Sequence, residues 1–231
     1  MTVDGWRPAT LLARLPPRAR AEMLGLGAER HYRSGDVLFR EGAASRETLL
    51  LLSGFVKVTA SHGPHAVLLA VRGAGDPVGD LAAMSGQPRS ATVIACTPIV
   101  ARFILPETLR AFLKAHPPAE QLLSALVVEQ LRLANRRRVE AATRPVLGRL
   151  IGVILDLIAI CGDGQEDGSV LLPNWFNQAE LAALAGAASP DTVQRSLRTL
   201  RDRGLIENGY RWVRIKDPER LAAARDGVSS A

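Results

Sequence analysis

The chain has 231 residues, of which 47% are hydrophobic and 23% are charged, and these proportions are typical of a globular protein. Its longest apolar run, residues 147–160, is too short and too charged to span a bilayer, because it contains Arg149 and Asp156. No charged-then-apolar signal sequence opens the chain, so we expect a cytoplasmic protein without membrane contact. The net charge of +6 allows a polyanionic partner.

The residue types that bind metals or carry out catalysis show no pattern that fits either role. Cys96 and Cys161 match no metal-ligand spacing, and we expect two reduced thiols. The histidines also lack ligand-like spacing, so we expect no metal site. They are His31, His62, His65 and His116. We find no nucleophile–base pair and no P-loop, and we therefore do not expect an enzyme.

The first half of the chain changes from helical to β-like patterns. Residues 1–30 have the pattern of short helices, broken by prolines, that would form a lid or a packing element. Short β-like runs separated by glycine turns follow, and they predict a small barrel or jelly roll. The runs are residues 37–39, 49–52, 55–59, 67–71, 92–94 and 99–104.

Residues 78–93 have the composition of a nucleotide pocket. A glycine turn leads into a short helical segment at residues 81–84, and Arg89 follows after loop residues. Backbone N–H groups at a helix start, together with one guanidinium, suit a bound phosphate. Asp80 would repel a phosphate but suits a hydroxyl donor such as a ribose 2′-OH. The stretch therefore predicts a ligand with both groups.

This pattern resembles the phosphate-binding cassette of the CRP/FNR family of bacterial transcription regulators. The matching residues are Gly79, Asp80, Leu81, Arg89, Ser90 and Ala91. The resemblance implies a cyclic-nucleotide-binding β-roll in which Arg89 and Ser90 hold the cyclic phosphate and Asp80 takes the ribose hydroxyl. Asp80 departs from the family, which has Glu there. The alternative is an ordinary surface turn in which Arg89 pairs with Asp80.

A long helix is predicted after Pro117, and it runs to about residue 143. Leu122, Leu126 and Leu133 form an apolar stripe that can pack on its own domain or on a second copy. The resemblance implies the second copy, and hence a homodimer. Asn135 follows the stripe, and two roles are open for it: a hydrogen bond to a purine base, or a polar residue that sets the register of a helix pair.

A winged helix-turn-helix is predicted after the hinge at Arg144-Pro145. Residues 177–207 have the order helix, glycine-containing turn, helix, with Gly186 in the turn. Asn177 and Ser189 are the expected N-caps, and Val193, Leu197 and Leu200 the buried stripe. An Asn208-Gly209 turn and the alternating residues 212–215 predict the wing hairpin.

The charge of this segment favours DNA as its partner. Residues 189–216 contain seven basic residues and three acidic ones. Ser189 and Thr192 are expected to reach phosphates, and Arg195 to bind a guanine. The predicted DNA-binding residues are Asn177, Ser189, Asp191, Thr192, Gln194, Arg195 and Arg198. Pro190 and Asp191 depart from the best-known family pattern, so the usual family operator is not expected. The alternative is a winged helix that contacts only protein.

Together these features predict an α+β protein in three parts: a jelly-roll-like β-roll at residues 1–116, a dimerisation helix and hinge at 117–144, and a winged helix-turn-helix at 145–231. The family resemblance implies a homodimeric regulator controlled by a cyclic nucleotide, with cAMP favoured, which binds double-stranded DNA half-sites about 34 Å apart and contacts RNA polymerase. The alternatives are a ligand-independent regulator and a sensor of cGMP or c-di-GMP. A haem or iron–sulfur sensor is disfavoured, because the chain has no cysteine cluster.

Overall fold

One long helix, α5 (Pro117–Thr143), runs through the boundary between two compact units of the chain. The computed structural model describes residues 5–62, 65–173, 175–176, 178–187, 189–209 and 212–227. The first unit comprises Met1–Ala66 and Ala70–Leu131, and the second comprises Val67–Leu69 and Arg132–Ala231. The two units are described separately below.

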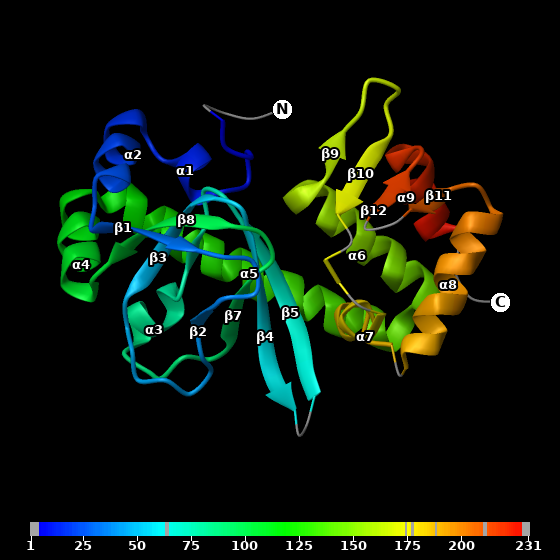
Figure 1. Cartoon of the computed structure of the whole chain (residues 1–231), viewed down its shortest axis with the longest axis horizontal. Helices are drawn as coiled ribbons and strands as arrows, with labels where there is room; N and C mark the ends of the chain where they lie inside the picture. Colours follow the sequence, from blue (N-terminus) through cyan, green and yellow to red (C-terminus); the bar gives the residue numbers. More distant parts are fainter. Residues whose placement is uncertain are drawn as a thin grey trace. The chain divides into compact units, whose positions relative to one another are not determined.

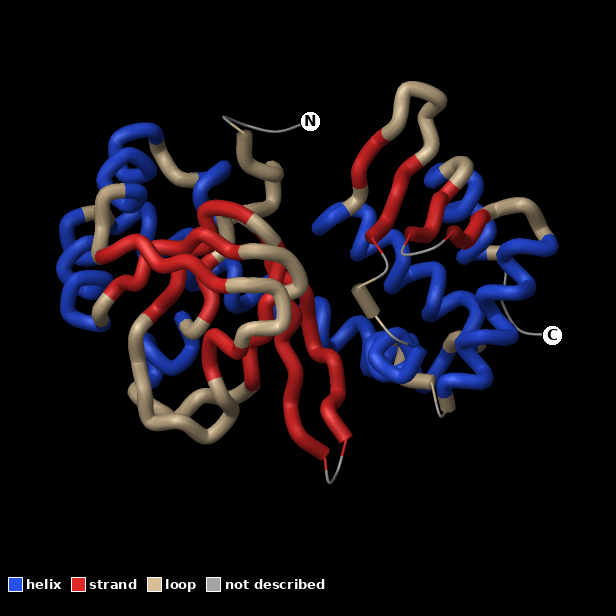
Figure 2. The backbone as a smooth tube through the Cα atoms, viewed as in Figure 1, coloured by secondary structure: helices blue, strands red, loops and turns tan. Residues whose placement is uncertain are grey.

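Two four-stranded sheets form the centre of the first unit (Figures 1 and 2). In the first sheet the order is β1 (Ala28–Tyr32), β8 (Ile99–Ile104), β3 (Thr48–Ser53) and β6 (Pro77–Val78). In the second it is β2 (Val37–Phe39), β7 (Thr92–Ala95), β4 (Phe55–His62) and β5 (His65–Gly73). The pairs β1–β8, β3–β8, β3–β6, β2–β7 and β4–β7 are all antiparallel. This is the jelly-roll-like arrangement that the sequence predicts.

Strand β3 explains how the helices attach to the sheets. Leu49 and Leu51 point into the core between the sheets, while Leu50, on the opposite face, packs against helices. Because both faces are buried, the strand is a continuous apolar run rather than an alternating one. The covering helices are α1 (Leu11–Arg14), α2 (Pro17–Leu24), α4 (Pro106–Ala115) and the start of α5. The N-terminal segment is thus a packing element.

The predicted strands of this unit are confirmed, but β1 and the two-residue strand β6 were not predicted. The first of these, β1, shows why. Its five residues are mostly polar, and four of them are exposed. Its pairing with β8, from Ala28 opposite Phe103 to Tyr32 opposite Ile99, makes it a strand. Because β8 lies far from β1 in the sequence, the residues around β1 give no local indication that it forms a strand.

The second unit is a winged helix. It contains α6 (Val146–Cys161), β9 (Asp163–Gly164), β10 (Val170–Pro173), α7 (Gln178–Leu184), α8 (Pro190–Asp202), β11 (Ile206–Gly209), β12 (Trp212–Ile215) and α9 (Pro218–Asp226). A four-stranded sheet in the order β11, β12, β10, β9 forms the wing. The predicted α+β fold, with a β-roll, a long helix and a winged helix-turn-helix, is confirmed.

The predicted position of the wing turn is wrong. Asn208 pairs with Val213, and Gly209 pairs with Trp212, so both belong to β11. The connection between the strands is at residues 210–211, which lie outside the described part of the chain. The Asn-Gly pair is a strong turn signal, but here it predicts the turn two residues before the point at which the strand pairing ends.

The apolar stripe of α5 is used within the first unit. Leu123 is buried in the core of that unit, and Leu122 and Leu126 pack against it. Two of the three predicted stripe residues thus pack on their own unit, while the third, Leu133, is partly exposed, and the pairing of the stripe with a second copy stays a prediction. Other large apolar residues of α5 are exposed in the chain, namely Val128, Leu131 and Val139. Among the described residues, no helix is both long and apolar enough to cross a bilayer.

Candidate functional site

The short helix α3 (Asp80–Ser85) begins at a glycine that no other residue can replace without strain. Gly79 has φ of +80°, in the left-handed region. A Cβ atom there would lie 2.5 Å from Nη1 of Arg89 and 2.7 Å from the Phe39 ring. The glycine therefore allows the backbone to approach the guanidinium closely, and its carbonyl oxygen accepts a hydrogen bond from Nη1 of Arg89 at 2.8 Å.

Arg89 is buried and is held by groups of its own unit. Its Nε donates to Ser45 Oγ at 3.1 Å, and its Nη2 donates to the Glu47 carbonyl oxygen at 2.7 Å. The Glu47 carboxylate forms an ion pair with the same nitrogen at 3.5 Å. The guanidinium carbon lies 3.7 Å from the centre of the Phe39 ring, in cation–π geometry. Both hydrogen-bonding edges of the guanidinium are thus occupied.

Two buried carboxyl groups lie beside this helix start. Burial raises the pKa of Asp80, and the N–H groups of Asp80 and Leu81 and the charge of Arg72 oppose this effect. Burial also raises the pKa of Asp76 to about 6, while Arg72 and the N–H groups of Gly73 and Leu11 lower it. Desolvation disfavours the charged form of each carboxyl, and it exceeds the effect of the neighbouring positive charges.

The structure brings some of the predicted cassette residues together and separates others. Gly79, Asp80 and Arg89 meet at the start of α3, and Ala91 is buried beside β7. The side chains of Leu81 and Ser90 are exposed. Asn135 is exposed on α5 and belongs to the second unit. Arg89 does not form the ion pair with Asp80 that the alternative predicted. Its ion pair is with the carboxylate of Glu47.

Sequence reasoning missed three partners of Arg89: Phe39, Ser45 and Glu47. The last lies 42 positions before Arg89 and immediately before β3. The one sequence signal for Glu47 is that an acidic residue stands directly before the apolar run of β3. Burial lowers the pKa of Arg89, and the Glu47 carboxylate is the largest influence that opposes this shift. Glu47 therefore acts as the counter-ion of the buried guanidinium.

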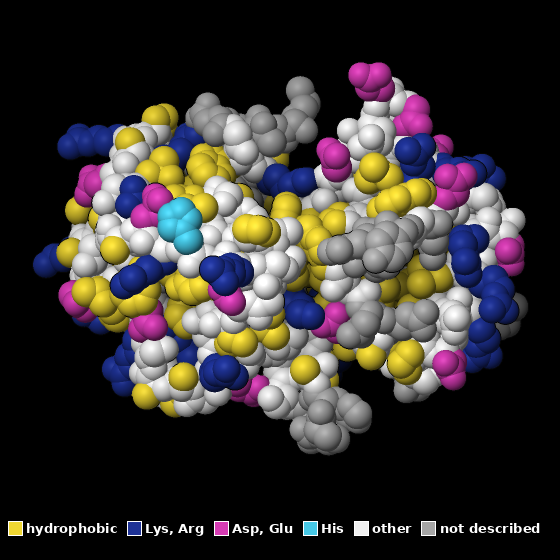
Figure 3. Space-filling model, in the orientation of Figure 1, with side chains coloured by type: hydrophobic (Ala, Val, Ile, Leu, Met, Phe, Trp, Pro, Cys, Tyr) yellow, Lys and Arg dark blue, Asp and Glu magenta, His cyan; other side chains and the backbone are white. Residues whose placement is uncertain are grey.

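Helix α8 presents a polar face opposite a buried one. Val193, Ser196 and Leu200 are buried, and Leu197 is partly buried. The exposed residues recur at intervals of three and four, which places them on one helical face. They are Asp191, Gln194, Arg195 and Arg198. Figure 3 shows Lys and Arg side chains gathered over α8, and the face is suited to contact with a polyanion.

Hydrogen bonds connect side chains at the start of α8. Ser189 is the N-cap residue, as predicted, but its hydroxyl forms no capping bond. It lies instead 3.1 Å from Thr192 Oγ1, which also accepts a hydrogen bond from Arg195 Nη2 at 3.3 Å. The predicted phosphate-contacting hydroxyls and the predicted base-reading arginine are thus in contact. Asn177, the other predicted N-cap and DNA contact, lies outside the described residues.

The turn after α7 contains the predicted glycine, Gly186, and Arg149 of α6 forms a hydrogen bond with it. Gly186 has φ of +58°, in the left-handed region. The N–H of Ala187 donates to the carbonyl of Ala182, and this hydrogen bond closes the C-terminal end of α7. Nη1 of Arg149, in α6, donates to the Gly186 carbonyl oxygen at 2.8 Å. Arg149 therefore ties the helix-turn-helix to the helix behind it.

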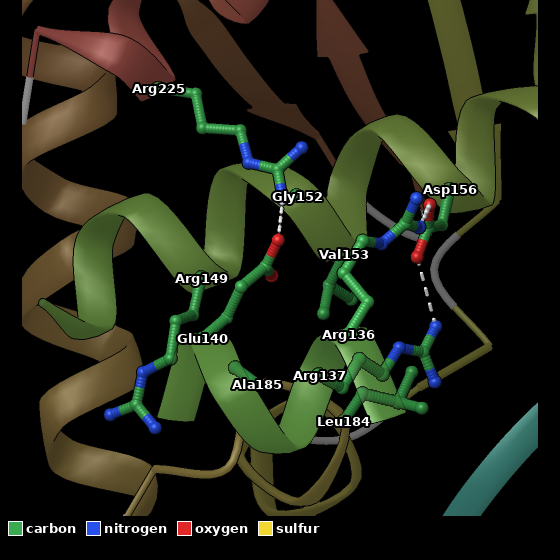
Figure 4. A pocket seen from close by; sticks show the side chains of 10 residues that line it. All are labelled: Arg136, Arg137, Glu140, Arg149, Gly152, Val153, Asp156, Leu184, Ala185 and Arg225. Carbon is green, nitrogen blue, oxygen red and sulfur yellow. Dashed lines mark hydrogen bonds and ion pairs between the residues drawn. The ribbon is translucent and has the colours of Figure 1, made fainter. Parts of the chain in front are cut away.

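Ionised side chains also join the end of α5 to α6 and α9 around a small pocket (Figure 4). Asp156 of α6 accepts hydrogen bonds from Arg136 and Arg137 of α5, both at 3.1 Å. Arg225 of α9 pairs with Glu140 of α5. The last turns of α5 are therefore attached to the winged helix by charge pairs.

Comparison with known proteins matches both units. Residues 29–116 match the model of the cyclic nucleotide-binding domain, and residues 148–224 match that of the Crp-like helix-turn-helix domain. The chain is 26% identical over 201 residues to the cyclic AMP receptor protein of Thermus thermophilus, an alignment that covers 87% of this chain and 89% of the relative.

Solved structures share the fold. FixK2 from Bradyrhizobium japonicum superposes with a TM-score of 0.73 at 16% identity, over 89% of this chain and 98% of that one. The c-di-GMP responsive regulator CLP from Xanthomonas campestris superposes with a TM-score of 0.68 at 21% identity, over 87% of this chain and 99% of that one. At these identities the likeness concerns the fold alone.

Proposed function

The chain belongs to the CRP/FNR family of transcription regulators, and we propose that it is a homodimeric DNA-binding regulator controlled by a cyclic nucleotide, with cAMP the first candidate. The observation that carries this proposal is the meeting of buried Arg89 and buried Asp80 at the start of α3. A guanidinium suits the cyclic phosphate, and a carboxylate suits the ribose hydroxyl. Leu81, Ser90 and Ala91 complete the proposed cassette.

The relatives of the chain indicate which nucleotides to test. The relative from Thermus thermophilus is named for cyclic AMP, which favours cAMP. The structural neighbour CLP is described as c-di-GMP responsive, so cGMP and c-di-GMP belong in the same test. Asp80 is one methylene shorter than glutamate, and a different reach toward the sugar would change this preference.

The recognition helix would be α8, inserted into the major groove of DNA. Its exposed face would present Asp191, Gln194, Arg195 and Arg198 to base edges, with Ser189 and Thr192 near phosphates. Asn177 is proposed as a further contact. Reading two half-sites requires two copies of the chain, and RNA polymerase is the further partner that the family implies.

The pairing surface that we propose is the exposed face of α5. Val128, Leu131 and Val139 are exposed apolar residues on one face of this helix, and Asn135 lies among them in the sequence. A polar residue within an apolar helix–helix contact sets register, and we propose this role for Asn135 ahead of a contact with a purine. The charge pairs from α5 to α6 and α9 would transmit a change in the pairing of the two α5 helices to the recognition helix α8.

One observation favours a second candidate function, that of a ligand-independent regulator. The guanidinium of Arg89 already has protein partners on both edges and an aromatic ring on one face. An arginine satisfied in this way stabilises the fold without any ligand. In this alternative the cassette is a structural joint, and DNA binding does not depend on a nucleotide.

Calorimetric titration of the full chain with cAMP, cGMP and c-di-GMP tests the proposal. We expect saturable heat with one of them, and tighter binding to a selected DNA operator when that nucleotide is present, as measured by fluorescence anisotropy. No heat with any nucleotide, together with unchanged DNA affinity, would replace the proposal by the ligand-independent alternative.

A further inference from the structure

We infer that Glu47 is an internal anion that occupies Arg89 and that an incoming phosphate must displace, so that Glu47 sets the affinity of the cassette for its ligand. This inference rests on the proposed function of the cassette. It concerns a residue outside the Gly79–Ala91 segment, on the loop that precedes β3 (Thr48–Ser53).

The partners of Arg89 differ in how easily they can leave. The carbonyl oxygens of Gly79 and Glu47 accept at 2.8 and 2.7 Å, and they belong to the backbone. The Glu47 carboxylate lies 3.5 Å from Nη2, which is beyond a good hydrogen bond. Only a side-chain rotation is needed to remove it. Ser45 Oγ, the other side-chain partner, is uncharged and lies closer, at 3.1 Å from Nε. The carboxylate is therefore the partner of the guanidinium that an incoming anion would replace.

Exposure supports the same conclusion. The side chain of Arg89 is 2% exposed, whereas that of Glu47 is 22% exposed. The second oxygen of the carboxylate, Oε2, accepts from the N–H of Arg46 at 3.1 Å, next to it in the chain. The carboxylate thus lies on the solvent side of the buried cation. A phosphate that arrives from solvent would meet Glu47 before Arg89.

Electrostatics makes the exchange competitive. A buried guanidinium is stable only with a counter-charge. Without ligand, Glu47 supplies this charge, and Asp80 is a weaker influence. With ligand, the phosphate would supply it, and a carboxylate kept at the same nitrogen would repel the phosphate. Removal of the Glu47 charge should therefore favour the ligand, at the expense of the stability of the free protein.

The test compares the wild-type chain with E47Q by calorimetric titration with cAMP. Gln is similar in shape and can still accept a hydrogen bond, but it lacks the charge. We expect E47Q to be less stable without ligand and to bind cAMP about tenfold more tightly, a change equivalent to about 1.4 kcal/mol. E29Q is the matched control, because Glu29 is an exposed residue of the same unit that pairs with His31. We expect its affinity to be unchanged.

The possible outcomes separate this inference from the function on which it rests. Equal or weaker binding by E47Q, with wild-type binding intact, would overturn the inference and leave the proposed function standing. Binding by E47Q alone would support the inference and show that the wild-type cassette is closed by its own carboxylate. Absence of binding in both proteins, with cGMP and c-di-GMP as well as with cAMP, would overturn the proposed function and this inference with it. If E47Q fails to fold, E47D retains the charge at a shorter reach, and tighter binding by E47D supports the inference while unchanged binding overturns it.

Discussion

Arg225 of α9 forms an ion pair with Glu140 near the end of α5, and its guanidinium packs over Gly152 of α6. A Cβ atom at position 152 would lie 3.0 Å from Nη2 of Arg225, so the glycine makes room for this contact. The backbone carbonyl of Arg225 also accepts a hydrogen bond from Nη1 of Arg144 at 3.2 Å. The last helix of the chain thus fixes the end of the long helix.

Loss of the Arg225–Glu140 pair should destabilise the second unit. The two side chains are 22% and 15% exposed, so E140Q leaves a largely buried guanidinium without its counter-charge. We expect the free energy of unfolding to fall by about 1.5–3 kcal/mol, the range for hydrogen bonds of charged groups. Urea denaturation followed by tryptophan fluorescence measures this change, since Trp175 and Trp212 belong to the second unit.

A control on the same helix is available. Glu129 pairs with Arg14 at 2.9 Å, but their side chains are 52% and 31% exposed. Exposed pairs contribute only about 0–1 kcal/mol. An E129Q loss as large as that of E140Q would show that burial is not what gives the Arg225 pair its importance.

The Gly79→Ala substitution should be far more damaging than Gly35→Ala. Both glycines have positive φ, which costs an alanine about 1–2 kcal/mol. Gly35 has open space where a Cβ would lie, whereas at Gly79 that atom would meet Arg89 and Phe39. We expect a total loss of about 3 kcal/mol or more for Gly79→Ala, because the close contact adds to the strain. Similar losses of stability in urea would contradict the close approach at Gly79.

Arg195→Ala should reduce operator discrimination more than general DNA affinity. Arg195 lies on the exposed face of α8 and can bind a guanine through two hydrogen bonds. We expect a loss of about 1–3 kcal/mol of discrimination between a selected operator and a variant with one base pair changed. Anisotropy titrations with both DNA molecules measure it. Arg201→Ala, also exposed but in the last turn of α8, is the control and should affect both equally. A uniform loss for Arg195→Ala would instead assign this residue to phosphate.

Leu131→Lys should convert the proposed dimer into a monomer. Leu131 is 60% exposed on α5, and a charge at the centre of an apolar helix contact opposes association. Sedimentation equilibrium should give twice the chain mass for the wild type and the chain mass for the variant. Leu105→Lys, at an exposed leucine before α4, should leave the mass unchanged. A monomeric wild type would remove this surface from the proposal.

Stability should depend on the protonation of Asp76. Its pKa is raised from 3.8 in the unfolded chain to about 6 in the fold, so the folded state binds the proton more tightly. Stability from this group is therefore present below pH 3.8 and is lost as the pH rises through 6. The limit is about 3 kcal/mol, from 1.36 kcal/mol per pKa unit, and partial solvent access reduces it.

The Asp76→Asn variant should lose that pH dependence. Asn retains an acceptor for the N–H groups of Gly73 and Leu11 but does not ionise. We expect urea denaturation at pH 4.5 and pH 7 to differ less for the variant than for the wild type. Asp36→Asn removes a carboxylate from an exposed turn, where it accepts from the N–H of Arg33, and should leave the wild-type difference in place. An unchanged slope in Asp76→Asn would contradict the raised pKa.

The sequence alone was enough to predict the structural features that depend on residues close together in the chain. Glycine-separated apolar runs gave the strands, and prolines at helix starts placed α4, α5 and α8, because backbone preference is local. The cassette segment was found in the same way, since Gly79 and Arg89 are ten positions apart. These features identify the family, and they are the basis for proposing a cyclic nucleotide as the ligand.

Contacts between residues that are far apart in the sequence could be identified only from the tertiary structure. It paired the polar strand β1 with β8, and it placed Glu47 against Arg89. It also decided which face of α5 remains open, because Leu122 and Leu126 are used by the core of their own unit. A side chain's partner is set by how sheets and helices close in space, and periodicity reveals that a residue is buried without revealing what buries it.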